Sequence, residues 1–186
     1  RAHGEKVENI VNIKKNDEGY YIKFYNKNIK SNRNELLILP RYDKEKKTSV
    51  VEIIDLSNLK VIHRYRHNID ITYKNFNVAR DNTRKRFQYG HPIILDDGSL
   101  ISKNVMFSPL FKIDICGNDI WATKELDFHH SIERDHEDNI WVPGTPIKVS
   151  SSVKNNLKIL RGGLQFADDS IVKIDPENGK IIYKKS

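Results

Sequence analysis

The chain has 186 residues, which is enough for one domain with a hydrophobic core but short for two. Hydrophobic residues make up 38% and charged residues 31%, which excludes a disordered chain, and no apolar run is long enough to span a membrane. The net charge of +7 comes from scattered Lys and Arg, with local clusters at residues 44–47 and 84–86. Because no nucleic-acid-binding motif accompanies these clusters, they favour solvated loops or an anionic small substrate over a nucleic-acid groove.

The N-terminal part of the chain contains a weak hairpin pattern. Residues 10–22 are typical of two short strands around a turn at residues 16–19. The connection that follows, residues 26–48, is predicted to be a loop with a short strand at residues 36–39, before Pro40. No stretch keeps an apolar period of 3.6 beyond two turns, so the sequence predicts strands rather than helices.

Three segments, residues 50–62, 109–121 and 170–182, share one pattern at intervals of about sixty residues. Each begins with two apolar residues three apart, continues to an aspartate and a polar turn, and ends in a second apolar run. The aspartate carboxylate can bond the backbone of its own turn, and the Asn or Gly that follows tolerates a positive φ. Each copy is therefore predicted to be a β-hairpin.

A second type of hairpin alternates with the first. Residues 89–101 align with residues 128–141 when one residue is gapped in the turn, and this alignment places His91 on His130. Residues 10–22 are a weaker copy, with Asn12 nearest to the histidine position. Two hairpins per repeat give four strands, and a four-stranded antiparallel unit repeated along a chain is the blade of a β-propeller.

We therefore predict an all-β chain that forms a single partial β-propeller domain over residues 1–186. Three four-stranded antiparallel blades are expected at residues 5–66, 87–125 and 127–186, with loop insertions at residues 26–48 and 143–168. Propellers close with about four to eight blades, and the N-terminus begins with neither Met nor a signal peptide. We expect a fragment of a longer protein or, as the alternative, a homo-oligomer that closes the ring by self-association.

Two strings carry a family resemblance: HHSIERDHEDNIW at residues 129–141 and FADDSIVKIDPENGKIIY at residues 166–183. They resemble the arylsulfotransferase (aryl-sulfate sulfotransferase) family, whose members typically have a His-His-Asp-like opening, an Asp-Gly-Asn-Ile turn and a later Asp-Asp-x-Ile hairpin. The resemblance extends from about residue 87 onward. The chain departs from the family at Ser131, where an acidic residue is usual, and at Asp138, where Gly is usual; Asp is tolerated in such turns.

The resemblance implies a six-bladed propeller that transfers a sulfuryl group between phenolic compounds through a histidine nucleophile. The donor would be a small aryl sulfate and the acceptor a phenol, without a nucleotide sulfate donor. The resemblance also implies a periplasmic or otherwise exported protein. We expect no cofactor.

The first strand of each propeller blade lines the central channel, so His91 and His130 are expected to face one channel mouth. One neutral imidazole can attack sulfur, and a second can bind the sulfuryl oxygens or take the phenol proton; we assign catalysis to this pair. Consecutive residues of a regular strand point to opposite faces, so His129 is expected to point away from His130. Substrate binding is assigned to Arg161, beside two glycines, and to His129; Arg134 is the second candidate arginine.

Three other interpretations of the residues remain open. A metal site is suggested by His129, His130, Asp135 and His136, but a hairpin would spread these side chains over both faces and a turn, so we expect no metal. The histidines are structural in the second interpretation, and the chain is then a non-catalytic β-propeller that binds a ligand or a protein. A basic surface that binds nucleic acid is the third interpretation.

Overall fold

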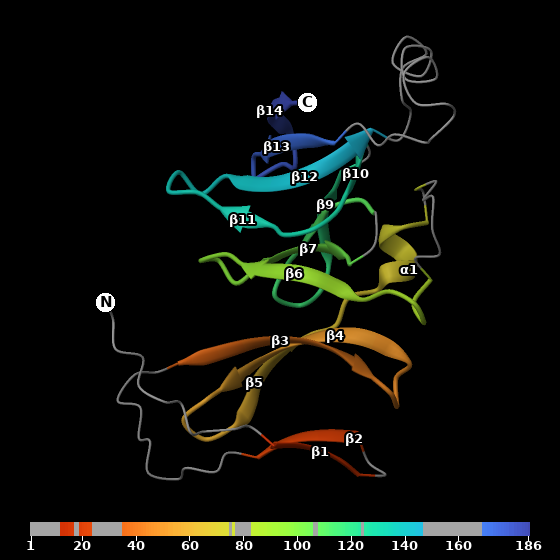
Figure 1. Ribbon diagram of the computed structural model, residues 1–186, viewed down its shortest axis with the longest axis vertical. Helices are drawn as coiled ribbons and strands as arrows, with labels where there is room; N and C mark the ends of the chain where they lie inside the picture. Colours follow the sequence, from red (N-terminus) through yellow and green to blue (C-terminus); the bar gives the residue numbers. More distant parts are fainter. Residues whose placement is uncertain are drawn as a thin grey trace.

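The computed structural model describes residues 12–16, 19–23, 35–74, 76, 83–105, 108–123, 125–146 and 169–186. In these ranges the chain is all-β, as predicted, with antiparallel strands in four sheets and a short helix α1 (Ile69–Thr72) (Figure 1). No helix within them is long and apolar enough to cross a membrane.

Each sheet is built from strands that follow one another in the chain. The strands are β1 (Asn12–Asn16), β2 (Gly19–Lys23), β3 (Leu36–Asp43), β4 (Thr48–Asp55), β5 (Lys60–Tyr65), β6 (Tyr89–Ile94), β7 (Leu100–Asn104), β8 (Phe111–Ile113), β9 (Asp119–Ala122), β10 (Leu126–Phe128), β11 (Glu133–Arg134), β12 (Ile140–Pro146), β13 (Ser170–Ile174) and β14 (Ile181–Lys185). Strands β1 and β2 form sheet 1, β3 to β5 form sheet 2, β6 to β9 form sheet 3, and β10 to β14 form sheet 4. Strands β10 and β11 pair with opposite ends of β12, so together they take the place of one interrupted strand.

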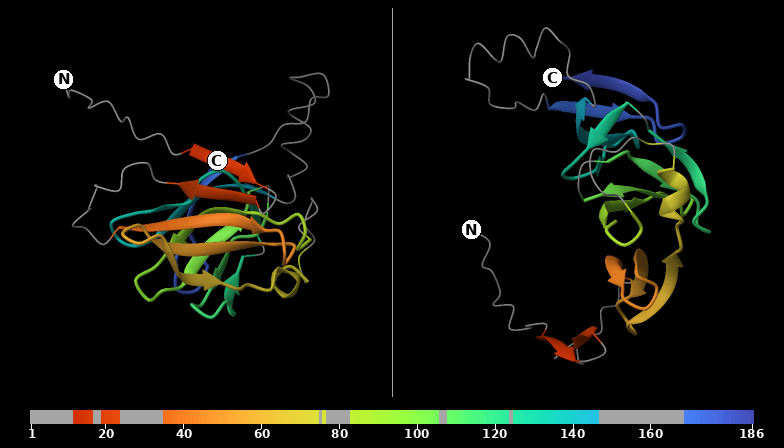
Figure 2. Two further views of the ribbon diagram at one scale, coloured as in Figure 1. Left: turned by 90° about the horizontal axis from the view of Figure 1, so that it is seen from below. Right: turned by 90° about the vertical axis from the view of Figure 1, so that its right-hand side faces the viewer.

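Sheets 2, 3 and 4 pack face to face along a curve. In the right-hand view of Figure 2, β3 and β6 lie on the concave side of this curve, and β5 and β9 lie on the convex side. One core fills the space between sheets 2 and 3: Val51, Tyr65, Ile69, Tyr73, Phe87, Tyr89, Leu100, Phe111 and Ile113. A second core fills the space between sheets 3 and 4: Leu95, Ile101, Leu110, Leu126, Phe128, Ile132, Ile140, Val142, Val172 and Ile174. Burial of these side chains between the sheets holds the stack together.

The repeated hairpins form as predicted, as β4–β5, β8–β9 and β13–β14. In each hairpin the register shifts between the two residues that precede the aspartate, which is Asp55, Asp114 or Asp175. The carboxylate then accepts a backbone N–H of its own turn and the side-chain amide of the turn Asn. In the first and third turns, Leu59 (φ 60°) and Gly179 (φ 72°) donate their backbone N–H to the carbonyl of the aspartate.

Sheets 1 and 2 differ from the predicted first blade. We expected the hairpin at residues 10–22 to share a sheet with residues 50–62, and residues 26–48 to be a loop with a short strand. The hairpin forms as β1–β2 in a separate sheet, and β3 pairs along all eight of its residues with β4. A turn of residues 44–47 joins β3 to β4. Pairing of β4 with β3 therefore closes a shorter loop, and costs less chain entropy, than pairing of β4 with the hairpin β1–β2 would.

Candidate functional site

The first strands of sheets 3 and 4 are interrupted at matching places. In β6 the register shifts around His91 and Pro92, and Pro92 has no N–H to donate to the ladder. In sheet 4 the corresponding break, residues 129–132, separates β10 from β11. His91 has a φ of 46° and His130 a φ of 54°. The two histidines that the sequence aligns therefore share one left-handed backbone conformation on neighbouring sheets.

This conformation is uncommon for a residue other than glycine. It costs roughly 1–2 kcal/mol per residue, although His tolerates it better than most residues do. Strained residues of this kind cluster at active sites and ligand-binding sites. Both His91 and His130 expose their side chains, so both imidazoles are accessible to a ligand.

The break also changes how His129 and His130 are related. We expected them on opposite faces of a regular strand, but the left-handed residue ends the alternation of the strand. The two rings lie edge to face with centroids 4.7 Å apart. His129 is buried and His130 is exposed. The pair therefore combines an imidazole fixed by its surroundings with an imidazole that faces solvent.

His129 is held by polar groups of sheet 4. Its Nε2 lies 3.1 Å from Asp169 Oδ1 and 3.2 Å from Thr145 Oγ1, and the Thr145 hydroxyl donates to Asp169. The backbone N–H of His129 donates to the carbonyl of Pro143. Burial lowers the pKa of His129, although the Asp169 carboxylate opposes this shift. The neutral imidazole is therefore favoured in the folded chain.

A buried lysine lies across from the histidine-bearing break of β6. Lys103 pairs with Gly90, the residue before His91, and its side chain is 0% exposed. Its Nζ donates to the Asn104 carbonyl at 3.2 Å, and in the described ranges no carboxylate lies within ion-pair distance. A Cβ at position 90 would lie 3.3 Å from Nζ, so the glycine leaves room for the ammonium group. Burial lowers the pKa of Lys103 to about 8.

Lys103 was not predicted from the sequence, nor was Asp127. The signal for Lys103 was its spacing of two residues from Ile101, which places a lysine on a buried face of β7. Asp127 lies on β10, two residues before His129, and burial raises the pKa of its carboxyl group. Lys103, Asp127 and His129 are thus ionisable groups whose charged forms are disfavoured by burial, a pattern typical of functional sites.

The two candidate arginines have different outcomes. Arg161 lies outside the described residues. Arg134 of β11 donates to Asp138 at 2.8 Å and to Asp96 at 3.0 Å, so its guanidinium ties a turn of sheet 4 to a turn of sheet 3. These carboxylates occupy the donors that an anionic ligand would need. Asp138 itself has a φ of 67°, which confirms that aspartate can replace glycine in this turn.

The side chains of Asp135 and His136, which were considered for a metal site, have different surroundings. Asp135 accepts the backbone N–H groups of Glu137 and Asn139 and the indole N–H of Trp141, and His136 is exposed in the turn. Across the described ranges, no three His, Cys, Asp or Glu side chains gather as a metal ion would require.

An exposed imidazole beside a buried neutral one, with a buried cation on the neighbouring sheet, is suited to nucleophilic attack on an anionic electrophile. In comparisons with known proteins, the chain matches no family model and no curated protein. The residues at the junction of sheets 3 and 4 are therefore the basis for a functional assignment.

Proposed function

We propose that the chain is part of an exported, six-bladed β-propeller enzyme that transfers a sulfuryl group from an aryl sulfate to a phenol. The observation that carries this proposal is the matching left-handed conformation of His91 and His130 at the interruptions of the first strands of neighbouring sheets. The curved stack of antiparallel sheets supports the propeller, because blades follow one another in this way around a channel. The sequence resemblance supports the reaction.

In the first half of the reaction, a ring nitrogen of neutral His130 attacks the sulfur of the aryl sulfate. An N–S bond forms while the S–O bond to the aryl group breaks, and the bonding electrons leave with the phenolate. In the second half, the acceptor phenol attacks the sulfur, the N–S bond breaks, and its electrons return to His130. His91 takes the proton of the acceptor phenol, and its ring can also bind a sulfuryl oxygen.

The neighbouring groups position and polarise this pair. The His129 ring contacts the His130 ring edge to face, and its bonds with Asp169 and Thr145 hold it in place. Lys103 is mostly protonated at pH 7, since its pKa is about 8, and its buried charge favours the anionic sulfuryl group. Arg161 is proposed to bind the sulfuryl oxygens.

The decisive experiment is release of nitrophenolate from p-nitrophenyl sulfate in the presence of a phenol acceptor. We choose His130→Asn because Asn tolerates the left-handed conformation but lacks the nucleophilic nitrogen. Turnover should fall by at least about 10³-fold in this variant. The matched control, His136→Asn, changes the exposed turn histidine of the same stretch and should keep the wild-type rate.

Two results would count against this proposal. Wild-type turnover in His130→Asn would exclude His130 as the nucleophile. No turnover by the intact, folded wild-type protein would favour the alternative function, a non-catalytic β-propeller that binds a ligand or a protein.

A further inference from the structure

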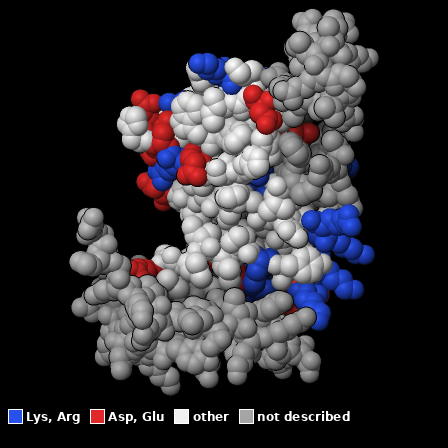
Figure 3. Space-filling view, viewed as in Figure 1, with Lys and Arg blue, Asp and Glu red and all other residues white. Residues whose placement is uncertain are grey.

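A basic pocket lies where sheet 2 meets the connection to sheet 3. Its volume is about 230 Å³, and its walls include Lys46, Thr48, Arg66, His67, Asn68 and Arg84. Lys46 belongs to the β3–β4 turn, and Arg84 belongs to the turn before β6. Figure 3 shows Lys and Arg atoms gathered on this side of the molecule. The fold thus joins two basic clusters that are far apart in the sequence.

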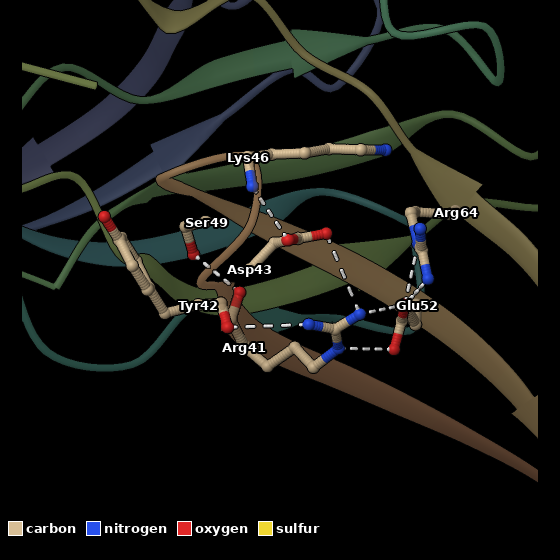
Figure 4. A network of polar contacts seen from close by, with 7 residues as sticks. All are labelled: Arg41, Tyr42, Asp43, Lys46, Ser49, Glu52 and Arg64. Carbon is tan, nitrogen blue, oxygen red and sulfur yellow. Dashed lines mark hydrogen bonds and ion pairs between the residues drawn. The ribbon is translucent and has the colours of Figure 1, made fainter. Parts of the chain in front are cut away.

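In the part of the chain that the structure describes, no carboxylate pairs with the Lys and Arg side chains of the basic pocket. Among the described residues, Lys46, Arg66 and Arg84 have no ion-pair partner, and none of the described lining residues is acidic. The backbone N–H of Lys46 donates to Asp43, but its side chain extends away from that carboxylate (Figure 4). Like charges held together repel each other, so a bound anion would stabilise this arrangement.

The walls of the basic pocket are fixed from two sides. The carbonyl of Arg66 packs directly against Gly117, where a Cβ would clash with it. His67 Nε2 lies 2.8 Å from Asp119 Oδ1, so the ring is turned toward this carboxylate and anchors the connection to sheet 3. Thr48 is buried at the start of β4. A site held in this way loses little conformational freedom when a ligand binds.

We propose that the basic pocket binds the phosphate or sulfate group of a small anionic molecule. The guanidinium groups of Arg66 and Arg84 can each donate two parallel hydrogen bonds to such a group, and Lys46 adds a point charge. The side-chain amide of Asn68 makes no helix-capping bond and is a further donor. The volume is below the roughly 300 Å³ at which pockets for drug-sized ligands begin, which favours a small ligand.

A small ligand fits these observations better than a nucleic acid. A nucleic acid requires a row of cations along a groove, whereas the cations here converge on one pocket and Glu45 interrupts the basic turn. The inference is also independent of the proposed sulfuryl transfer, because His91, His129 and His130 do not line the basic pocket.

Isothermal titration calorimetry of the full chain with inorganic phosphate and with sulfate, at constant ionic strength, tests the proposal. We expect one saturable site, and Arg84→Gln and Lys46→Gln should each weaken binding about tenfold. Lys85→Gln and Lys44→Gln are matched controls, since they remove the same charge from exposed neighbouring residues that do not line the pocket. The controls should keep the wild-type affinity within about twofold.

Titration of His130→Asn with p-nitrophenyl phosphate and with p-nitrophenyl sulfate then shows whether the pocket prefers a phosphate or a sulfate group, because this variant lacks the proposed nucleophile for the sulfate ester. His130→Asn should leave phosphate binding unchanged, which separates this site from the histidine site. Equal weakening in the controls, or binding that does not saturate, would overturn the proposal. Tighter binding of a single-stranded oligonucleotide with a steep salt dependence would also overturn it, in favour of a nucleic-acid surface.

Discussion

Sheet 2 and the junction of sheets 3 and 4 each bury a charged side chain, but they treat it in opposite ways. Glu52, 3% exposed, accepts hydrogen bonds from Arg41 and Arg64, and the Arg41 bond is the main reason that its pKa is lowered (Figure 4). Lys103, 0% exposed, has a lowered pKa because burial disfavours its charge. A lowered pKa therefore marks a stabilised charge at Glu52 and a destabilised charge at Lys103.

The difference separates a structural cluster from a candidate functional one. Arg41, Glu52 and Arg64 come from β3, β4 and β5, so their bonds connect every strand of sheet 2. Lys103 connects no strands through an ion pair in the described part of the chain, and it pairs with Gly90, the residue before the strained His91. A buried charge that lowers stability is expected where activity needs it. Substitutions at the two places should therefore change stability in opposite directions.

The largest expected effect is loss of the carboxylate in sheet 2. Glu52→Gln should lower the free energy of unfolding at pH 7 by about 2–3 kcal/mol, because two half-exposed guanidinium groups lose their charged acceptor. Urea denaturation measures the change, with the exposed Glu45→Gln as the control. An equal effect in the control would show that the network does not stabilise the sheet.

The same carboxylate should make stability depend on acid. The pKa of Glu52 is lowered in the folded state, so its contribution is present above its ordinary value of 4.5 and is lost as pH falls through the folded pKa. Glu52→Gln should lack this part of the acid dependence.

The next largest effect has the opposite sign. Lys103→Met should raise the free energy of unfolding at pH 7 by about 1–3 kcal/mol, because it removes a buried charge and keeps an apolar side chain of similar length. The unfolded lysine holds its proton up to its ordinary value of 10.5, so wild-type stability should rise from pH 8 to 10.5, and this rise should disappear in the variant. Lys112→Met is the control: this lysine is also buried but lies 3.7 Å from Asp97, and its removal should give no gain.

A smaller effect is expected from the buried histidine. The pKa of His129 is lowered in the folded state, so the unfolded chain binds more protons as pH falls below its ordinary value of 6.5. Wild-type stability should therefore decrease from pH 7 to pH 5. In His129→Gln this decrease should be reduced, whereas His136→Gln, in the exposed turn, should behave like the wild type. An unchanged pH dependence in His129→Gln would mean that other groups cause it.

The smallest effect is expected at Arg134. Its ion pairs with Asp96 and Asp138 are exposed to solvent, and such pairs contribute little to stability. Arg134→Ala should keep the urea midpoint and the p-nitrophenyl sulfate turnover of the wild type. A loss of turnover would reassign Arg134 as a substrate-binding residue.

The sequence predicted the features that depend on local chemistry. Each repeated hairpin follows from an aspartate that bonds its own turn, and the alignment of His91 with His130 is matched by equal left-handed conformations. These properties involve few neighbouring residues, so a short pattern contains them.

Features that depend on distant residues were missed or placed wrongly. Either the hairpin β1–β2 or the strand β3 could have paired with β4, and the alternation of apolar and polar residues does not decide between them; β3 is the partner in the structure. The contact of His129 with His130 follows from a strand break, which the assumption of a regular strand excluded. Lys103 is notable only because it is buried without a carboxylate nearby in the described ranges, and burial is a tertiary property.

Two of the turns share a backbone but not a sequence. Leu59 and Gly179 occupy the same left-handed position, yet only glycine adopts it without strain. The Leu59 side chain is 46% exposed, so it contributes little burial in return. The third hairpin thus supplies, within this same polypeptide, a template for engineering the first: residue 58 is already Asn, so the single change Leu59→Gly is a route to a more heat-resistant protein.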